Sequence, residues 1–379
     1  MRTARSLAGV TPPPAFIGPA TSRWLAAGAA AALAGVLAKA GFAKLRAQLP
    51  TGHIAHIHPM AVAPRARPED FFSPEDWRAL TARSSWRGLW LVLHCWGVIG
   101  AAMVIGVLWP VTLPLVVLTI GTRQLGLFIL MHDAAHGLLH ANRRINDAVA
   151  VGLCSSTLHD YRPYHLQHHR FVQQPEDPDL GLSAPFPISR ASLRRKLLRD
   201  LSGQTFYKQR LAPLVDGFKA RLAKAPTAAA ASPLVRQSQE LARGRRFLIG
   251  NALGLAVFAA AGYGWVWLLM WLLPMATWLP LVTRVRNIAE HALVGANQAD
   301  PMRQARTTHA GWVERWLLAP YWVNYHCEHH LFTQVPCWNL PRAHALLRRQ
   351  GGTARMSWQP GYLAMLRLAT RPAGTATGA

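Results

Sequence analysis

The sequence is poor in acidic residues and in cysteine. Only 17 of its 379 residues are Asp or Glu, against 41 Lys or Arg, so the formal net charge is +24. Charged residues make up 15%, well below the roughly 25% of an average soluble domain. The four cysteines are scattered, which excludes a disulfide scaffold and gives no support to a zinc site built from thiolates. They are Cys95, Cys154, Cys327 and Cys337.

Apolar residues, by contrast, are abundant. They account for 51% of the chain, and 15 residues are Trp. This content excludes a disordered protein. A soluble nucleic-acid-binding protein would suit the positive charge but not the long apolar runs, so we expect a membrane protein and no nucleic-acid partner.

Four apolar segments are long enough, alone or as a pair, to enter a bilayer. The first has 22 residues and no formal charge, enough to cross about 30 Å of hydrocarbon. The second is interrupted only by Arg123, and the last two are short but joined by the tight turn Gly262-Tyr263-Gly264. A pair of buried core helices is the alternative for these two, although their tryptophans favour interfacial anchoring. The four predicted spans are residues 88–109, 111–131, 247–261 and 265–282.

Charge placement predicts the orientation of these segments. Residues 132–246 carry 18 Lys or Arg and 11 more follow Val282, whereas the predicted turns at Pro110 and Tyr263 carry none. By the positive-inside rule, both hairpins enter from the cytoplasm and both termini stay there. In a bacterium this would be a multi-pass protein of the cell inner membrane.

The rest of the chain is divided around this membrane unit. We expect residues 1–72 to be an N-terminal cytoplasmic or interfacial region, in which residues 24–37 are apolar but short for a span. Residues 73–350 form the membrane domain, which begins with a helix capped by Ser73, with Pro74 in its first turn. Residues 351–379 are predicted to be a C-terminal tail.

Nine of the 17 histidines fall into four clusters. Two clusters are HxxHH boxes, one is an HxxxH box, and one is a lone histidine four residues after Asn287. Positions i, i+3 and i+4 share a helix face, so we expect each cluster to aim its imidazoles at one point on the cytoplasmic side. The nine are His132, His136, His165, His168, His169, His291, His326, His329 and His330.

Convergent boxes of this kind indicate a metal site. Nine imidazoles are too many for one tetrahedral zinc, and imidazole-rich sets suit Fe, Zn, Cu or Ni. Two ions with four or five nitrogens each would use all nine, and a redox pair of irons is the natural choice. Three neighbouring carboxylates, Asp133, Glu290 and Glu328, are expected to accept imidazole N–H groups or simply to be solvated. The other histidines, including His140 and His344, are not expected to be ligands.

At these residues the sequence resembles the integral-membrane fatty acid desaturase family, the di-iron enzymes with three histidine boxes. The resemblance rests on HDAAHG, HLQHH and NYHCEHHLFTQVPCWNLP and covers roughly residues 88–349. It implies that the nine histidines hold two irons and that Asn287 reaches one iron through water. It also implies an O₂-dependent enzyme that forms a double bond in an acyl chain carried by a lipid, coenzyme A or a carrier protein. Because no fused electron-transfer domain is recognisable, a separate ferredoxin or cytochrome b5-type protein would supply the electrons.

We therefore expect an all-α integral membrane protein, with four transmembrane helices in two hairpins and a cytosolic helical cap that carries a histidine-rich di-metal site. A hydroxylase or ketolase of an acyl lipid, sterol, alkane or carotenoid on the same scaffold is the nearest alternative. A metal transporter or metal-binding membrane protein is a remote one, because it would need ionisable residues at mid-membrane in several spans.

Overall fold

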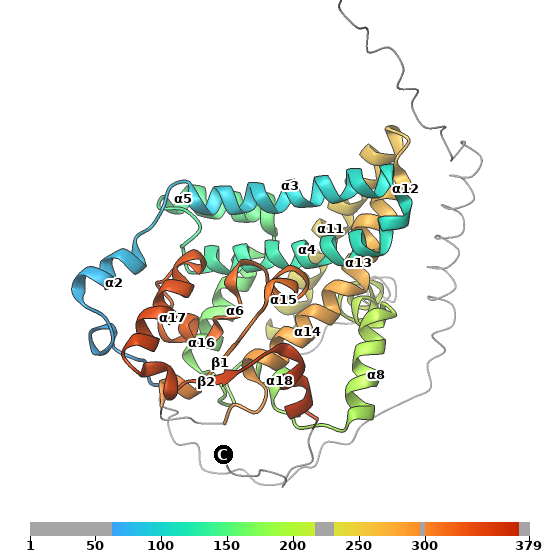
Figure 1. The fold of residues 1–379 in the computed structure, drawn as a ribbon. Coiled ribbons are helices and arrows are strands. Elements are labelled where there is room, and N and C mark those ends of the chain that lie inside the picture. Colours follow the sequence, from blue (N-terminus) through green and yellow to red (C-terminus); the bar gives the residue numbers. More distant parts are fainter. Residues whose placement is uncertain (1–62, 217–230, 296–299, 371–379) are drawn as a thin grey trace, which may run out of the picture.

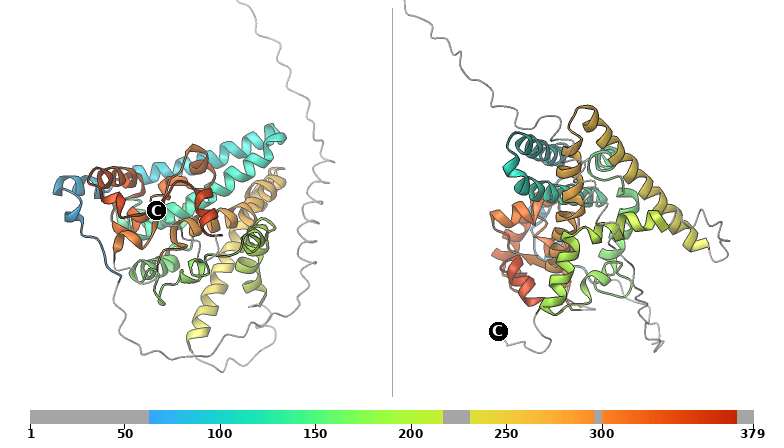
Figure 2. Two further views of the ribbon diagram at one scale, coloured as in Figure 1. Left: turned by 60° about the horizontal axis from the view of Figure 1, so that its bottom comes forward. Right: turned by 90° about the vertical axis from the view of Figure 1, so that its right-hand side faces the viewer.

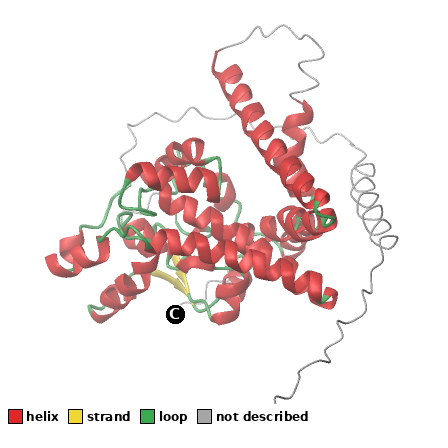
Figure 3. Ribbon diagram, turned by 90° about the horizontal axis from the view of Figure 1, so that it is seen from above, coloured by secondary structure: helices red, strands yellow, loops and turns green. Residues whose placement is uncertain are grey.

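The computed structural model describes residues 63–216, 231–295 and 300–370, and for residues 231–243 only the helical course. It is mostly helical, with one pair of very short strands (Figure 1; Figure 3). The predictions for residues 1–62, among them the interfacial segment 24–37, lie outside the described residues.

Two long antiparallel helices form one side of the molecule (Figure 1). They are α3 (Arg87–Leu108) and α4 (Leu113–Ala135), joined by η2 (Pro110–Thr112). Trp109 and Pro110 end α3, since proline has no N–H to continue the helix. Only 28% of the most apolar window of α3 is buried, against 67% for α4, so α3 lies on the outside and α4 reaches into the core.

A second helical path runs from the turn at Gly262 to the histidine at position 291. It consists of α12 (Gly264–Val266), η5 (Trp267–Leu272), α13 (Leu273–Ala276) and α14 (Trp278–His291). The long α11 (Ala231–Ala260) precedes the turn, where Gly262 has a φ of +81° that suits glycine. Figure 2 shows α11 extending past the body of the molecule.

Within the residues that the structure describes, three helices are long and apolar enough to cross a membrane: Arg87–Leu108, Pro110–Ala135 and Gly264–His291. They correspond to the first, second and fourth of the predicted spans, with Trp109 of the first just past the end of its helix. The third, residues 247–261, lies on α11, which is not among the three in the part of the chain that was described. Four spans in two hairpins and a cytosolic cap therefore stay a prediction.

Shorter helices pack beside α4 and α14 and build the region that carries the histidines. Between α4 and α11 they are α5 (Arg143–Val149), η3 (Ala150–Cys154), α6 (Leu158–Arg170), α7 (Leu180–Ser183), α8 (Arg190–Leu201), α9 (Gln204–Phe206) and η4 (Tyr207–Leu211). After α14 they are η6 (Pro301–Arg303), α15 (Trp312–Leu317), η7 (Pro320–Trp322), α16 (His326–Leu331), η8 (Cys337–Asn339), α17 (Leu340–Arg349), η9 (Gly352–Ala354) and α18 (Tyr362–Leu368).

The predicted C-terminal tail begins too early. Strand β2 (Ser357–Gln359) pairs in parallel with β1 (Arg306–Thr308), so the fold is not strictly all-α. Beyond β2, Tyr362 and Met365 of α18 are buried in the main core. Residues 351–370 therefore belong to the folded unit, because the strand pairing and these apolar contacts hold them there.

The N-terminal boundary of the unit also lies earlier than position 73. Phe72 contacts both Trp77 of α2 (Pro74–Thr81) and the fully buried Phe332, with ring centroids 5.9 and 4.9 Å apart. Phe72 lies just after the short helix η1 (Pro68–Asp70), so the folded unit includes residues before position 73. The cap of α2 is confirmed, since the Ser73 hydroxyl accepts the N–H of Asp76 at 3.0 Å.

Candidate metal centre

Four helices bring the nine clustered histidines together. His132 lies in the last turn of α4 and His136 caps it, while α14 ends at His291. The two HxxHH boxes occupy the short helices α6 and α16. The apolar runs of α4 and α14 thus continue as helix into polar sequence, and each presents its histidine at its C-terminal end.

The nine side chains form two groups. We call His132, His136, His165, His169 and His329 the five-histidine group, and His168, His291, His326 and His330 the four-histidine group. Within each group, one nitrogen per ring lies within 4.8 Å of those of all the others. All nine candidate ligands are therefore close enough to share two ions.

Each HxxHH box is divided between the groups, contrary to the expectation that one cluster would aim at one point. In the box on α6, His165 and His169 belong to the five-histidine group, but His168 belongs to the four-histidine group. In the box on α16, His326 and His330 belong to the four-histidine group, but His329 belongs to the five-histidine group. The reason is helical geometry: positions i and i+4 differ by about 40° around the axis, but i+3 and i+4 by about 100°.

The spacing of the ring nitrogens is that expected of ligands around one shared ion in each group. In the five-histidine group, Nε2 of His169 is 2.9 Å from Nε2 of His165 and 3.0 Å from Nε2 of His329. In the four-histidine group, Nε2 of His326 is 2.9 Å from His291 and 3.1 Å from His330. Nitrogens about 2.1 Å from one ion lie about 3.0 Å apart at right angles and about 3.4 Å apart in a tetrahedron.

A buried nitrogen without a partner gives independent support. Nε2 of His132 is buried and has no hydrogen bond among the described residues. The rings of His165 and His329 each lie 4.3 Å from its own ring, centroid to centroid. An unpartnered buried polar atom is costly, and a metal ion bound by the five-histidine group would satisfy it.

Burial keeps these imidazoles in the form that binds metal. Loss of solvation, with a smaller effect of the neighbouring rings, holds the pKa of six histidines outside the three long apolar helices well below 6.5, so at pH 7 each has a free lone pair. These are His136, His165, His169, His326, His329 and His330.

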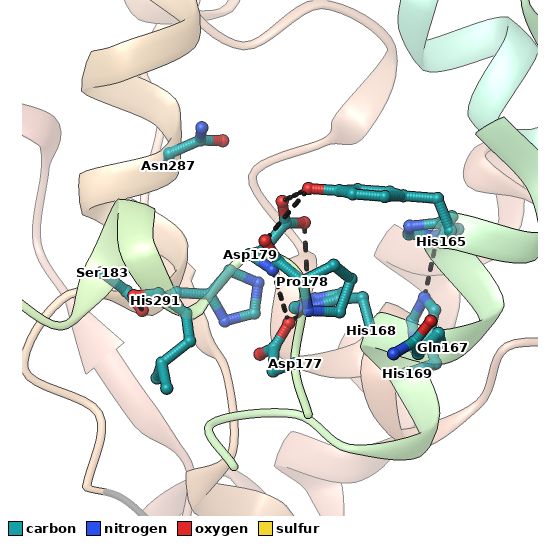
Figure 4. A network of polar contacts seen from close by, with 12 residues as sticks. His165, Gln167, His168, His169, Asp177, Pro178, Asp179, Ser183, Asn287 and His291 are labelled. Atoms are coloured by element: carbon teal, nitrogen blue, oxygen red, sulfur yellow. Dashed lines mark hydrogen bonds and ion pairs between the residues drawn. The ribbon is translucent and has the colours of Figure 1, made fainter. Parts of the chain in front are cut away.

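Asp177 orients one of the rings, and sequence reasoning did not identify it. Its Oδ1 accepts the Nδ1–H of His168 at 2.8 Å, which leaves Nε2 of that ring free for a metal (Figure 4). Both partners are buried. The backbone N–H groups of Gln173 and Asp179 also donate to Asp177 and fix its carboxylate. Asp177 lies in an irregular loop nine residues after His168, so no helical spacing in the sequence connects it with that histidine.

The three expected carboxylates behave differently from one another. Glu328 accepts hydrogen bonds from Thr307 and, at 2.5 Å, from His344, so it serves none of the nine clustered histidines. Asp133 lies 3.7 Å from Nδ1 of His132, beyond hydrogen-bond distance, and accepts the backbone N–H of Cys337. Glu290 lies 3.6 Å from Nε2 of His326.

The remaining described histidines do not join either group. His94 contacts the Tyr321 hydroxyl, and His140 accepts the backbone N–H of Asn142. His344 hydrogen-bonds to Glu328.

A pocket opens beside both groups, between α6, α7 and α14. Histidines of each group line it, together with Tyr161, Asp179, Ser183, Arg286, Asn287 and Glu290 among others. Asn287 lies one turn before His291 on the same helix (Figure 4), and its Oδ1 accepts a hydrogen bond from Arg286 at 3.1 Å. The pocket therefore leaves space of about the size of a water molecule beside both groups.

Comparison with known proteins agrees with this site. The family model "Fatty acid desaturase" matches residues 108–362, more than half of the chain and including all nine histidines. The chain is 26% identical over 261 residues to dihydrorhizobitoxine desaturase of Bradyrhizobium elkanii. The aligned region covers 65% of this chain and 71% of that protein.

Two chloroplastic omega-6 fatty acid desaturases are similarly distant. The one from Arabidopsis thaliana is 26% identical over 264 residues, covering 63% of this chain and 54% of that protein. The one from Brassica napus is 24% identical over 309 residues, covering 75% and 63%. The chain thus matches between about half and two-thirds of these two relatives.

Proposed function

The chain belongs to the fatty acid desaturase family, and we propose on that premise that it is an O₂-dependent, di-iron membrane enzyme that introduces a carbon–carbon double bond into a fatty acyl substrate. The convergence of nine histidine nitrogens in two groups carries this proposal. That the chain is a desaturase-like oxidoreductase follows from the family itself.

In this proposal all nine histidines are metal ligands, and their ions are irons. The five-histidine group holds one ion and the four-histidine group the other, with Asn287 binding the second through a water molecule. Bound there, two irons would supply the O₂ chemistry needed to break an unactivated C–H bond, which side-chain acids and bases cannot do.

The protein residues contribute position and protonation state. The buried neutral rings present their lone pairs without a proton to displace, and Asp177 holds His168 in the required tautomer. In this proposal the substrate would approach both groups from the side of the pocket beside Asn287.

The proposal also covers the membrane setting of the enzyme, its substrate class and its electron donor. We propose a multi-pass membrane protein with its termini and histidines on the cytoplasmic side, at the inner membrane if the source is bacterial. The three long apolar helices support the membrane setting. Its substrate would be an acyl-lipid, acyl-coenzyme A or acyl-carrier protein, and a separate ferredoxin or cytochrome b5-type protein would donate electrons.

Desaturation is preferred to hydroxylation or ketone formation because all three matched relatives are named desaturases. One relative is named for dihydrorhizobitoxine and two for omega-6 fatty acids, so the substrates differ within this set.

Mass spectrometry of total lipids and acyl chains from a host that expresses the chain tests the proposal. We expect a product two hydrogens lighter than a host acyl chain, absent when the host expresses His326→Ala. A product that gains one oxygen would instead identify a hydroxylase, and no difference between the two hosts would contradict an acyl substrate.

A further inference from the structure

Glu290 is a buried carboxylate beside the smaller of the two histidine groups. It precedes His291 on α14, and only 3% of its side chain is exposed. Its Oε1 has no hydrogen-bond partner among the described residues. A carboxylate removed from water in this way is costly unless a cation compensates it.

The position of Glu290 relative to His326 distinguishes a ligand from a supporting acceptor. An acceptor that orients a metal-bound imidazole binds the nitrogen turned away from the ion, as Asp177 does with Nδ1 of His168. Glu290 instead approaches Nε2 of His326, at 3.6 Å. That same nitrogen faces Nε2 of His291 and of His330. Glu290 therefore lies on the side where the ion would be.

The ordinary explanation for the burial is an ion pair with Arg286, one turn earlier on α14. The closest approach is 3.4 Å, from Nε of Arg286 to Oε2 of Glu290, and that Nε has no hydrogen-bond partner either. The charge of Arg286 thus attracts the carboxylate of Glu290, but no hydrogen bond forms between them, and Oε1 of Glu290 and Nε of Arg286 both stay without a partner.

The two groups also differ in ligand number, five against four. We propose that Glu290 binds the ion of the four-histidine group directly through a carboxylate oxygen, so that each ion has five protein ligands. Carboxylate is a hard donor suited to iron beside imidazoles. The inference rests on the proposed function in that it takes both groups to hold metal ions.

The test compares iron binding in three variants loaded with Fe²⁺ in detergent. Glu290→Gln keeps the size of the side chain and removes the charge, Arg286→Gln removes the ion pair, and Glu75→Gln is a matched control at an exposed site on α2. Iron release is followed against a ferrous chelator, and the two iron environments by Mössbauer spectroscopy of ⁵⁷Fe.

We expect Glu290→Gln to release one of its two irons at about 10–100-fold lower chelator concentration, and to change one of the two quadrupole doublets. Arg286→Gln and Glu75→Gln should keep both irons, and Glu75→Gln should also keep both doublets. If Glu290→Gln does not fold, Glu290→Asp, shorter by one methylene, should show the same selective loss.

Unchanged iron release and spectra in Glu290→Gln would overturn the inference, and so would an equal loss of iron in Arg286→Gln. In both cases the unmodified protein would still hold two irons, and the proposed function would stand. If the unmodified protein binds no iron, the proposed function falls and the inference with it.

Discussion

At the scale of single residues, burial decides whether the imidazoles of the centre are charged. Unfolding would expose the six buried rings of depressed pKa to water, where each takes up a proton below about pH 6.5. The folded protein does not bind these protons until a much lower pH, so the unfolded state binds more protons in the window below 6.5.

We therefore expect the ion-free protein to lose stability as the pH falls below 6.5. Each ring contributes a loss of up to about 1.4 kcal/mol per pH unit, and above 6.5 the dependence on these rings disappears. The melting temperature of chelator-treated protein in detergent, measured from pH 8 to pH 5, should be level and then fall. A melting temperature that stays constant down to pH 5 would contradict the burial of neutral rings.

The role of Asp177 can be separated from that of its neighbour on the same loop. Asp177→Asn removes the charge that supports His168 and should weaken iron binding about 10–100-fold. Asp179→Asn is the control, because Asp179 pairs with the Tyr164 hydroxyl and lies 3.8 Å from His168. The chelator concentration that removes half of the bound iron measures the effect of each substitution. Equal effects of the two substitutions would show that the loop, rather than the Asp177–His168 contact, matters.

At the scale of elements, one close helix contact depends on a glycine. A Cβ on Gly254 of α11 would lie 2.2 Å from the indole of Trp267, whereas one on Gly250 of the same helix meets nothing within 4 Å. The absence of a side chain at Gly254 is what lets α11 approach η5.

Alanine at these two positions should therefore act in opposite directions. Gly254→Ala forces the indole or the helix to move and should cost about 1–3 kcal/mol. Gly250→Ala, with open space and a better helix former, should be neutral or stabilising by up to about 1 kcal/mol. Thermal unfolding of the two variants in the same detergent checks this. A similar loss at both positions would rule out the contact as the cause.

The sequence predicted the helices better than the contacts between them. Long apolar runs and the Ser73-Pro74 cap were sufficient to place α3, α4 and α2. The ends of α4 and α14 were missed, because a helix continues past its apolar run when polar residues such as His132 and Glu290 can still make backbone hydrogen bonds. The β1–β2 pair was missed since three-residue strands carry no periodic pattern.

The site was predictable as a set of residues but not as an arrangement. The nine histidines share spacings that the sequence displays, whereas their division into five and four depends on how α6 and α16 face each other. Asp177 and the position of Glu290 on the ion side depend on tertiary contacts that no local pattern records.

At the scale of the whole molecule, the proposed topology makes a prediction that needs no substrate. Cysteine at position 263 (Tyr263→Cys) should react with a membrane-impermeant reagent from outside the cell, and cysteine at position 202 (Ser202→Cys) only after the cytoplasm is opened. Native Cys154, half-buried, is replaced beforehand to lower background labelling. Labelling of both positions from the same side would contradict the orientation derived from the charge-free turns.

The iron content of the purified chain tests the central claim most directly. Elemental analysis of folded protein, purified in mild detergent without chelators, should give about two irons per chain. His169→Ala and His329→Ala should lower that number and abolish turnover, because each opens the five-histidine group. One zinc per chain, or two variants that keep both irons and full activity, would contradict the account.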